Sequence, residues 1–411
     1  MDYSRKDHSA AHTRHYVFNQ LIPYIGNKRK LLPLIGRAIK HSPRTSGGVF
    51  VDLFAGSSVV SRYAKSRGMR VIANDWEPYA RVINSCYITT NGEPRFAKLG
   101  GYEQAIRTLN ELPPRIDWVT EHLCPRDDDK FDVQVDRMFY MRKNGMRIDA
   151  IRHQTLEWCE AGLIDQEEED CLLAPLLYQA CYRSNTSGVF KGFHNGWGGQ
   201  TGTALYRIAT DLVLEPAVFH DNGLRNEVYC MDAQLLAEQL ATTEIDIAYL
   251  DPPYNQHPYG SNYHVLNSVA LWDKPEISKS ITAGSKSAIR TDWRTERRSA
   301  YNYSDEATTA YRKLIGALNA RHILTSYSTD GMIRLDDLLL ANLERGRVTV
   351  EMQGYKRYRV SSQRFSRKPL NVEYVIVLDT HNKARQTLDE LKTAILRQEE
   401  ALLSRHPETM P

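Results

Sequence analysis

Short apolar runs rich in Val and Ile recur along the chain and alternate with stretches of helical periodicity. Runs of this length and composition predict buried β-strands. We expect seven strands, at residues 49–54, 70–74, 227–231, 245–250, 322–327, 347–352 and 372–378. We expect helices at residues 28–39, 59–66, 79–88, 233–240 and 307–318. Strands that alternate with helices indicate an α/β fold with a mostly parallel sheet.

The uneven spacing of the strands predicts an inserted domain. Two strands come before residue 75, and the third begins only near residue 227. The residues between them have helical patterns at 104–112, 131–144 and 167–182, and then a Gly-rich stretch at 187–202. We therefore expect a discontinuous sheet domain, residues 1–90 and 226–411, interrupted by a mainly helical domain, residues 91–225.

The last third of the sequence predicts three further features. A second insertion is expected at about residues 273–304, which are polar and without clear period. The last two strands would form an antiparallel hairpin. Residues 383–406 read as an amphipathic helix, whose apolar face packs either on the protein's own core or in a dimer interface. This face is formed by Leu388, Leu391, Ile395 and Leu402.

Composition and charge restrict the class of protein without identifying it. Of the 411 residues, 42% are hydrophobic and 25% are charged, as in ordinary folded proteins. The net charge of +3 does not by itself indicate a nucleic-acid partner. The six cysteines lack zinc-site spacing, and neither a signal peptide nor a membrane-spanning run is present. We expect a cytoplasmic protein with reduced thiols, no membrane contact and no metal.

The four residues Asp251-Pro252-Pro253-Tyr254 directly follow the apolar run 245–250. They are therefore expected at the carboxyl end of a buried strand, where open α/β sheets bind ligands. Two prolines remove two N–H donors, so a carboxylate and backbone carbonyls form a cluster of hydrogen-bond acceptors. The alternative is an ordinary turn, because Asp-Pro and Pro-Pro pairs occur in turns of every kind.

A cluster of acceptors suits an aromatic amine. Acceptors that hold both N–H groups out of the ring plane would restore the lone pair of the nitrogen, which could then attack an activated methyl group. Tyr254 offers a flat face on which a base could stack. A base inside a duplex cannot reach such a turn, so the nucleotide would have to be flipped out.

A second motif lies at residues 51–58, where a strand is followed by small residues and a helix. Gly56 permits close approach of a ligand to the backbone. The next strand ends at Asn74-Asp75, and an acid at this point is well placed to bind ribose hydroxyls. No G-x-G-x-x-G element or Walker lysine is present, which argues against NAD and ATP. S-adenosylmethionine, which has a ribose but no phosphate, fits better.

A third motif, Tyr24-Ile25-Gly26-Asn27-Lys28, precedes the first expected helix and by itself reads as a Gly turn with a helix cap. Together the three motifs resemble the Dam-type adenine-N6 DNA methyltransferases. The order is that of the family: a Gly-Asn-Lys element, Phe-x-Gly, an acid after the second strand, and Asp-Pro-Pro-Tyr. The likeness covers about residues 21–90 and 226–264, and more loosely extends to residue 378.

The resemblance implies a role for each matched residue. Tyr24 and Lys28 would border the methionine part of S-adenosylmethionine, and Asp75 would hold its ribose. Asp232 would contact the adenine of the cofactor. The catalytic residues would be Asp251, Pro252, Pro253 and Tyr254, of which the first two hold the target amine. The remaining expected cofactor contacts are Asn27, Asp52, Phe54, Ala55, Gly56 and Asp251. The chain departs from the family at Ser58, where Gly is common; we expect this serine to cap the helix.

Three segments are candidates for contact with DNA. The flap-like run that contains Tyr263 and His264 would close over a flipped base or form a plain surface loop. Arg183 and Lys191 lie near Gly and aromatic residues that would enter a groove or pack the insertion. A basic, aromatic segment near the C-terminus would bind phosphates or form a solvated turn. Its basic residues are Lys356, Arg357, Arg359, Arg364, Arg367 and Lys368.

We therefore expect a site-specific adenine-N6 methyltransferase that acts on double-stranded DNA, paired with a restriction endonuclease in a restriction–modification system. Two alternatives remain at this point. One is the same chemistry on cytosine N4, RNA or a protein amide. The other is a DNA-binding regulator without catalysis.

Overall fold

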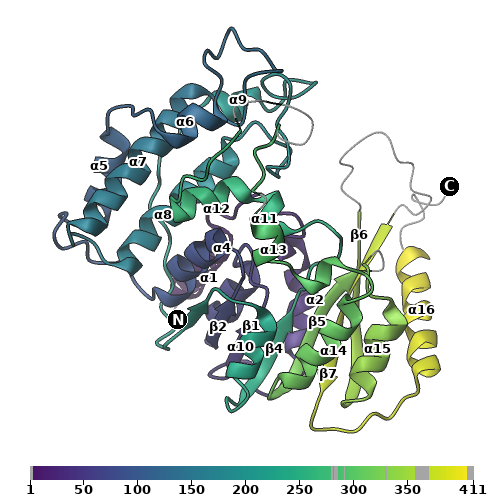
Figure 1. Ribbon diagram of the computed structural model, residues 1–411. Helices are drawn as coiled ribbons and strands as arrows, with labels where there is room; N and C mark the ends of the chain where they lie inside the picture. Colours follow the sequence, from purple (N-terminus) through teal and green to yellow (C-terminus); the bar gives the residue numbers. More distant parts are fainter. Residues whose placement is uncertain are drawn as a thin grey trace.

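The computed structural model describes residues 3–278, 281, 286–290, 292–328, 331–356 and 370–404. Within them, seven strands form one sheet in the order β3-β2-β1-β4-β5-β7-β6 (Figure 1). The strands are β1 (Val49–Asp52), β2 (Arg70–Asn74), β3 (Glu227–Tyr229), β4 (Ile245–Leu250), β5 (Ala320–Ser328), β6 (Arg347–Lys356) and β7 (Leu370–Asp379). Strands β1 to β5 run parallel, and β7 is antiparallel to β5 and β6. The predicted fold class and all seven predicted strands are confirmed.

Side chains of successive residues on the central strands enter two different cores. Phe50 and Ile247 belong to one apolar cluster, whereas their neighbours Val51 and Ala248 belong to the other. This is the alternation that a strand buried on both faces must have. Helices cover both faces of the sheet (Figure 1). They are α2 (Leu32–Ile39), α3 (Val59–Ser66) and α4 (Pro78–Asn84) on the first side, and α10 (Ala233–Gln239), α14 (Ala307–Ala317) and α15 (Leu335–Leu343) on the second.

The two ends of the chain add one helix each. Helix α16 (Leu388–Ser404) buries Leu391 and Ile395 in the second core, so its apolar face packs on the protein itself. Helix α1 (Tyr3–Phe18) was not expected, because its sequence is polar and has little amphipathic pattern. It is nevertheless anchored by Tyr16, which is fully buried and donates a hydrogen bond of 2.6 Å to the carbonyl of Tyr87.

The residues between α4 and β3 are mainly helical and lie largely beyond one end of the sheet (Figure 1). The helices are α5 (Tyr102–Glu111), α6 (Trp118–Leu123), α7 (Arg142–Glu160), α8 (Gln166–Tyr182) and α9 (Leu205–Ala209). The helix expected at residues 131–144 is wrong, since α7 begins only at Arg142. Aspartates stop an earlier helix: Asp132 Oδ1 accepts from the amide of Gln134, and Asp136 Oδ2 accepts from that of Asp132.

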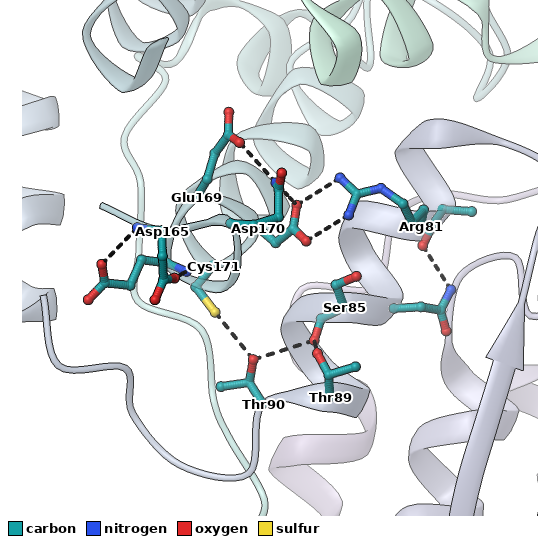
Figure 2. Close-up of polar contacts among 12 residues, drawn as sticks. Arg81, Ser85, Thr89, Thr90, Asp165, Glu169, Asp170 and Cys171 are labelled. Carbon is teal, nitrogen blue, oxygen red and sulfur yellow. Dashed lines mark hydrogen bonds and ion pairs between the residues drawn. The ribbon is translucent and has the colours of Figure 1, made fainter. Parts of the chain in front are cut away.

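Helices α4 and α8 join the sheet to these helices through polar contacts (Figure 2). Arg81 on α4 donates two hydrogen bonds of 2.9 Å to the carboxylate of Asp170 on α8. Asp170 is buried, and burial raises its pKa to about 6, against the lowering effect of Arg81. Below this pair, Thr90 Oγ1 lies 3.7 Å from Cys171 Sγ. The helical region is therefore fixed to the helix that follows Asp75.

Candidate active site

Three loops meet at the carboxyl ends of β2, β1 and β4, which are neighbours in the sheet. They carry Asp75, Phe54 and Asp251, respectively, and all three side chains line one cleft. The cleft has about 620 Å³ of space, continuous with solvent. Its walls are formed by Tyr24, Phe54, Asp75, Trp76, Glu77, Asp251, Pro253, Pro258, Tyr259, Arg297, Ser299 and Asn302. The sheet thus brings together motifs that are far apart in the sequence.

Asp75 holds the first two loops together. Its Oδ2 accepts a 2.8 Å hydrogen bond from the amide of Gly56, and its Oδ1 accepts one of 2.9 Å from the amide of Glu77. Burial raises the pKa of Asp75 to about 6, although these two bonds lower it. Glu77, whose amide is this second donor, also has a buried side chain. Burial raises the pKa of its carboxyl group to about 7.

The loop after β1 has a backbone that only a small residue allows. Gly56 has φ +47°, and a Cβ at this position would lie 3.0 Å from the ring of Tyr24. Tyr24 packs in turn on Tyr259 and Tyr263, at ring-centroid distances of 5.3 and 5.0 Å. The glycine therefore leaves room for an aromatic wall on the cleft.

Ser58 departs from its expected role. It lies at the N-cap position of α3, but its φ is +72° and its side chain makes no capping hydrogen bond. A capping serine requires an extended backbone, which the left-handed conformation excludes. The same conformation explains why glycine suits this position.

Asp251, Tyr254 and Lys28 form a compact polar group. Tyr254 Oη donates a 2.6 Å hydrogen bond to Asp251 Oδ1, and Lys28 Nζ lies 2.8 Å from this hydroxyl and 3.0 Å from the same carboxylate oxygen. Burial raises the pKa of Asp251, whereas the Lys28 ammonium and the Tyr254 hydroxyl lower it. Lys28 is only 5% exposed, so little water screens its attraction to the Asp251 carboxylate.

A second groove lies beside the cleft. Tyr254 and Asn255 line this groove together with Lys28, whereas Asp251 and Pro253 line the cleft. Tyr24 borders both spaces. The Asp251–Tyr254 turn therefore separates two openings, one with an acidic wall and one with tyrosines and lysines. The ring of Tyr254 packs at 4.5 Å on Tyr327, which fixes its plane.

Six residues expected at the cofactor do not line the cleft. Lys28 lines the second groove instead, and Gly56 faces the ring of Tyr24. The other four have structural contacts. Asp52 is buried below it and accepts a 2.7 Å hydrogen bond from Ser61 Oγ. Asn27 caps the turn that follows it, through a 2.7 Å bond from the amide of Arg29. Asp232 caps α10 by accepting from the amides at positions 234 and 235. Ala55 is buried within its loop.

The structure corrects the prediction that Tyr263 and His264 belong to an exposed flap. Tyr263 and His264 are buried, and they belong to the helical run of α11 (Tyr259–Asn262) and α12 (His264–Leu271). His264 Nε2 lies 2.9 Å from the carbonyl of Phe190, and burial lowers its pKa to about 4. Aromatic packing has therefore taken these two side chains into the core, so they do not form an exposed flap.

The other expected DNA contacts have different outcomes. Arg183 and Lys191 are partly exposed beside the Gly-rich stretch, and Arg183 Nη1 donates to the carbonyl of Arg207 at 3.1 Å. Lys356 ends β6, and its side chain is not described. Arg357, Arg359 and Arg364, with Arg367 and Lys368, lie outside the described residues.

Several cleft residues had no prediction from sequence. Glu77 lies two positions after Asp75, and this spacing was a usable signal. Arg297, Ser299 and Asn302 lie in the polar residues 273–304, which have no periodic pattern and therefore gave no signal.

The residues present suit a cationic cofactor that contains ribose. Three carboxylates, Asp75, Glu77 and Asp251, line the cleft, and the small Gly56 leaves room for the ring of Tyr24 in its wall. Among the described residues, no group of three His, Cys, Asp or Glu side chains is arranged to hold a metal ion. In the same part of the chain, no helix has the length and apolar composition that a bilayer crossing requires. Fold and cleft define an α/β enzyme with its site at the carboxyl ends of parallel strands.

Comparison with known proteins identifies the family. The profile described as D12 class N6 adenine-specific DNA methyltransferase matches residues 24–315, and the chain belongs to this family. It is 31% identical to the type II methyltransferase M.NlaIII of Neisseria lactamica, over 87% of this chain and 98% of that protein. It is 29% identical to the type II methyltransferase M.CviAII of Paramecium bursaria Chlorella virus 1, over 82% of this chain and 93% of that protein. Its match to the modification methylase StsI of Streptococcus sanguinis, 30% identical, covers 82% of this chain but 48% of the relative.

The resemblance drawn from the three motifs is thereby confirmed. The protein is an adenine-specific DNA methyltransferase of the type found in restriction–modification systems. The alternative substrates and the regulator without catalysis are not favoured by any of these relatives.

Proposed function

We propose that the protein uses S-adenosylmethionine to methylate the N6 amine of an adenine that is flipped out of double-stranded DNA. The observation that carries this proposal is the position of the Asp251–Tyr254 turn between an acid-lined cleft and a second groove. When bound, S-adenosylmethionine would supply a methyl group on a positively charged sulfur. Asp75, Glu77 and Phe54 are the residues that would hold it in the cleft.

The chain's own groups suit an incoming aromatic amine. Asp251, when ionised, offers only acceptors, and the two prolines beside it contribute no competing N–H. An amino group that donates to Asp251 and to the carbonyl of Pro252 would have its nitrogen lone pair turned toward the cleft. Tyr254, fixed by Tyr327, would provide the stacking face, and the Lys28 ammonium favours the ionised carboxylate against the effect of burial. The base would arrive through the second groove.

The target strand would be read by the helical insertion. We assign DNA recognition to residues 91–225, with Arg183 and Lys191 as contacts to phosphate, and to the basic segment that contains Lys356, Arg357, Arg359 and Arg364. The named relatives are modification enzymes, so we also propose a restriction endonuclease as the functional partner.

Transfer of a labelled methyl group tests the proposal. The purified protein is incubated with methyl-labelled S-adenosylmethionine and duplex DNA, and the digested nucleosides are separated. We expect the label in N6-methyladenine. Label in N4-methylcytosine, or in protein or RNA offered in parallel, would contradict the assigned substrate.

A further inference from the structure

A short polar segment, residues 297–302, contacts all three loops of the site. Arg297 Nη1 donates a 2.6 Å hydrogen bond to the carbonyl of Trp76, in the loop after β2. Tyr301 packs edge-on against Phe54, in the loop after β1, at 5.5 Å. Asn302 Nδ2 donates a 2.7 Å bond to the carbonyl of Asn255, directly after the Asp251–Tyr254 turn.

Burial and stacking restrict the side chains that make these contacts. Asn302 and Tyr301 are buried, and they belong to the single turn η3 (Ala300–Asn302). The guanidinium of Arg297 lies 4.3 Å from the ring of Trp293, on α13 (Trp293–Glu296), and this stacking restricts its orientation. A charged donor on a backbone carbonyl is among the stronger hydrogen bonds in proteins. The segment is therefore fixed at both ends while it spans the cleft.

We propose that residues 297–302, which we call the clasp, are positioning residues that hold the three loops at the separation required to bind S-adenosylmethionine. This inference rests on the cofactor assigned above. Arg297, Ser299 and Asn302 also line the cleft, so the clasp forms one of its walls. The loops that carry Asp75, Phe54 and Asp251 come from separate strands. One short segment that contacts each loop through a different residue fixes their mutual distance.

The charge of Arg297 has a second consequence. Among the cleft-lining side chains of the described residues, three are carboxylates and Arg297 is the one guanidinium or ammonium. Its positive charge lowers the pKa of Glu77, against the larger effect of burial. Arg297 thus helps to keep Glu77 ionised while its own hydrogen bond to Trp76 holds the loop.

Binding of S-adenosylmethionine to the full chain, measured by calorimetry without DNA, tests the clasp. We expect Arg297→Met, which keeps the apolar stem but removes charge and donors, to raise Kd about ten-fold. Arg297→Lys keeps the charge and one donor, so it should recover most of the affinity. Asn302→Ala should raise Kd about three-fold or more, through a different loop.

Arg298→Met is the matched control. Arg298 is the next residue, but its guanidinium pairs with Glu306, at 2.7 Å between Nη1 and Oε2, and it does not line the cleft. This variant should bind like the wild type. Thermal unfolding midpoints in the absence of ligand show whether each variant is folded. If Arg297→Met does not fold, the affinity of Asn302→Ala tests the clasp instead.

The outcomes separate the clasp from the cofactor assignment. If the wild type binds and both Arg297→Met and Asn302→Ala, folded, bind equally well, the clasp is refuted and the cofactor stands. If the wild type does not bind S-adenosylmethionine at all, the cofactor assignment fails and the clasp fails with it.

Discussion

Lys28 Nζ lies 3.0 Å from Asp251 Oδ1, and this ion pair joins the N-terminal motif to the proposed catalytic turn. The resemblance had assigned Lys28 to the methionine part of the cofactor. The structure instead places it in the second groove, where it contacts the carboxylate and the hydroxyl of Tyr254. Because a nearby cation favours the ionised carboxyl group, Lys28 opposes the effect of burial on Asp251. We infer that Lys28 sets the pH at which Asp251 becomes an acceptor.

Replacement of Lys28 should therefore move the pH profile of methyl transfer. In Lys28→Met the pKa of Asp251 rises, so the carboxylate ionises only at higher pH. The acidic limb of kcat should shift upward by about one pH unit or more. Rates measured from pH 5.5 to 9 check this, with the exposed Lys40→Met as control. A rate that falls equally at every pH would show that Lys28 has another role.

Gly56 gives a steric test of the cleft. In Gly56→Ala the new Cβ would meet the ring of Tyr24 at 3.0 Å, and the φ of +47° adds backbone strain of about 1 kcal/mol. We expect the affinity for S-adenosylmethionine to fall about ten-fold or more. Gly92→Ala, where a Cβ meets nothing within 4 Å, is the control. Equal affinities in the two variants would place the cofactor elsewhere.

Cofactor affinity should also depend on pH. Burial raises the pKa of Asp75 to about 6 and that of Glu77 to about 7. Both carboxyl groups are largely protonated at pH 5.5 and ionised at pH 8, and a sulfonium cation binds better to the ionised forms. Kd should thus decrease as pH rises through this window, and Glu77→Gln should weaken the dependence. Calorimetry at pH 5.5 and pH 8 measures the change. An equal Kd at the two pH values would contradict the proposed role of these carboxylates.

The Arg81–Asp170 pair should contribute mainly to stability (Figure 2). In Arg81→Met the buried carboxylate of Asp170 loses its partner, and the free energy of unfolding should fall by about 2–3 kcal/mol at pH 8. The folded-state pKa of Asp170, already raised to about 6, would rise further. Since protonation removes the buried charge, the loss should be smaller at pH 5.

Denaturant unfolding of Arg81→Met at both pH values measures this difference. Arg298→Met removes a surface ion pair with Glu306 and should change stability little at either pH. A loss in Arg81→Met that is larger at pH 5 than at pH 8 would reverse the sign expected for Asp170.

The sequence was sufficient for the sheet and for the loops that carry the motifs. Runs such as Ile245–Leu250 are largely apolar on both faces, as a buried parallel strand requires. The ends of these runs predicted that Asp75 and Asp251 directly follow strands. Because parallel strands share one carboxyl edge, these acids could be expected to meet. Their three-dimensional neighbours could not be predicted in the same way.

The features that were missed or wrongly predicted depend on contacts that periodicity does not report. The clasp is polar and irregular, and it is recognisable only by its bonds to the carbonyls of Trp76 and Asn255. Residues 131–144 have apolar spacing typical of a helix, yet Asp132 and Asp136 bond to backbone amides instead. The burial of Tyr263 and His264 depends on aromatic partners from distant segments, which composition does not reveal.

The acceptor role of Asp251 is the central claim, and Asp251→Ala tests it most directly. Transfer of labelled methyl groups to adenine in duplex DNA is compared between this variant and the wild type, with folding verified by thermal unfolding. We expect the rate to fall by at least about three orders of magnitude, because the principal acceptor for the amine is removed. Methyl transfer to adenine at an undiminished rate in the folded variant would contradict the account.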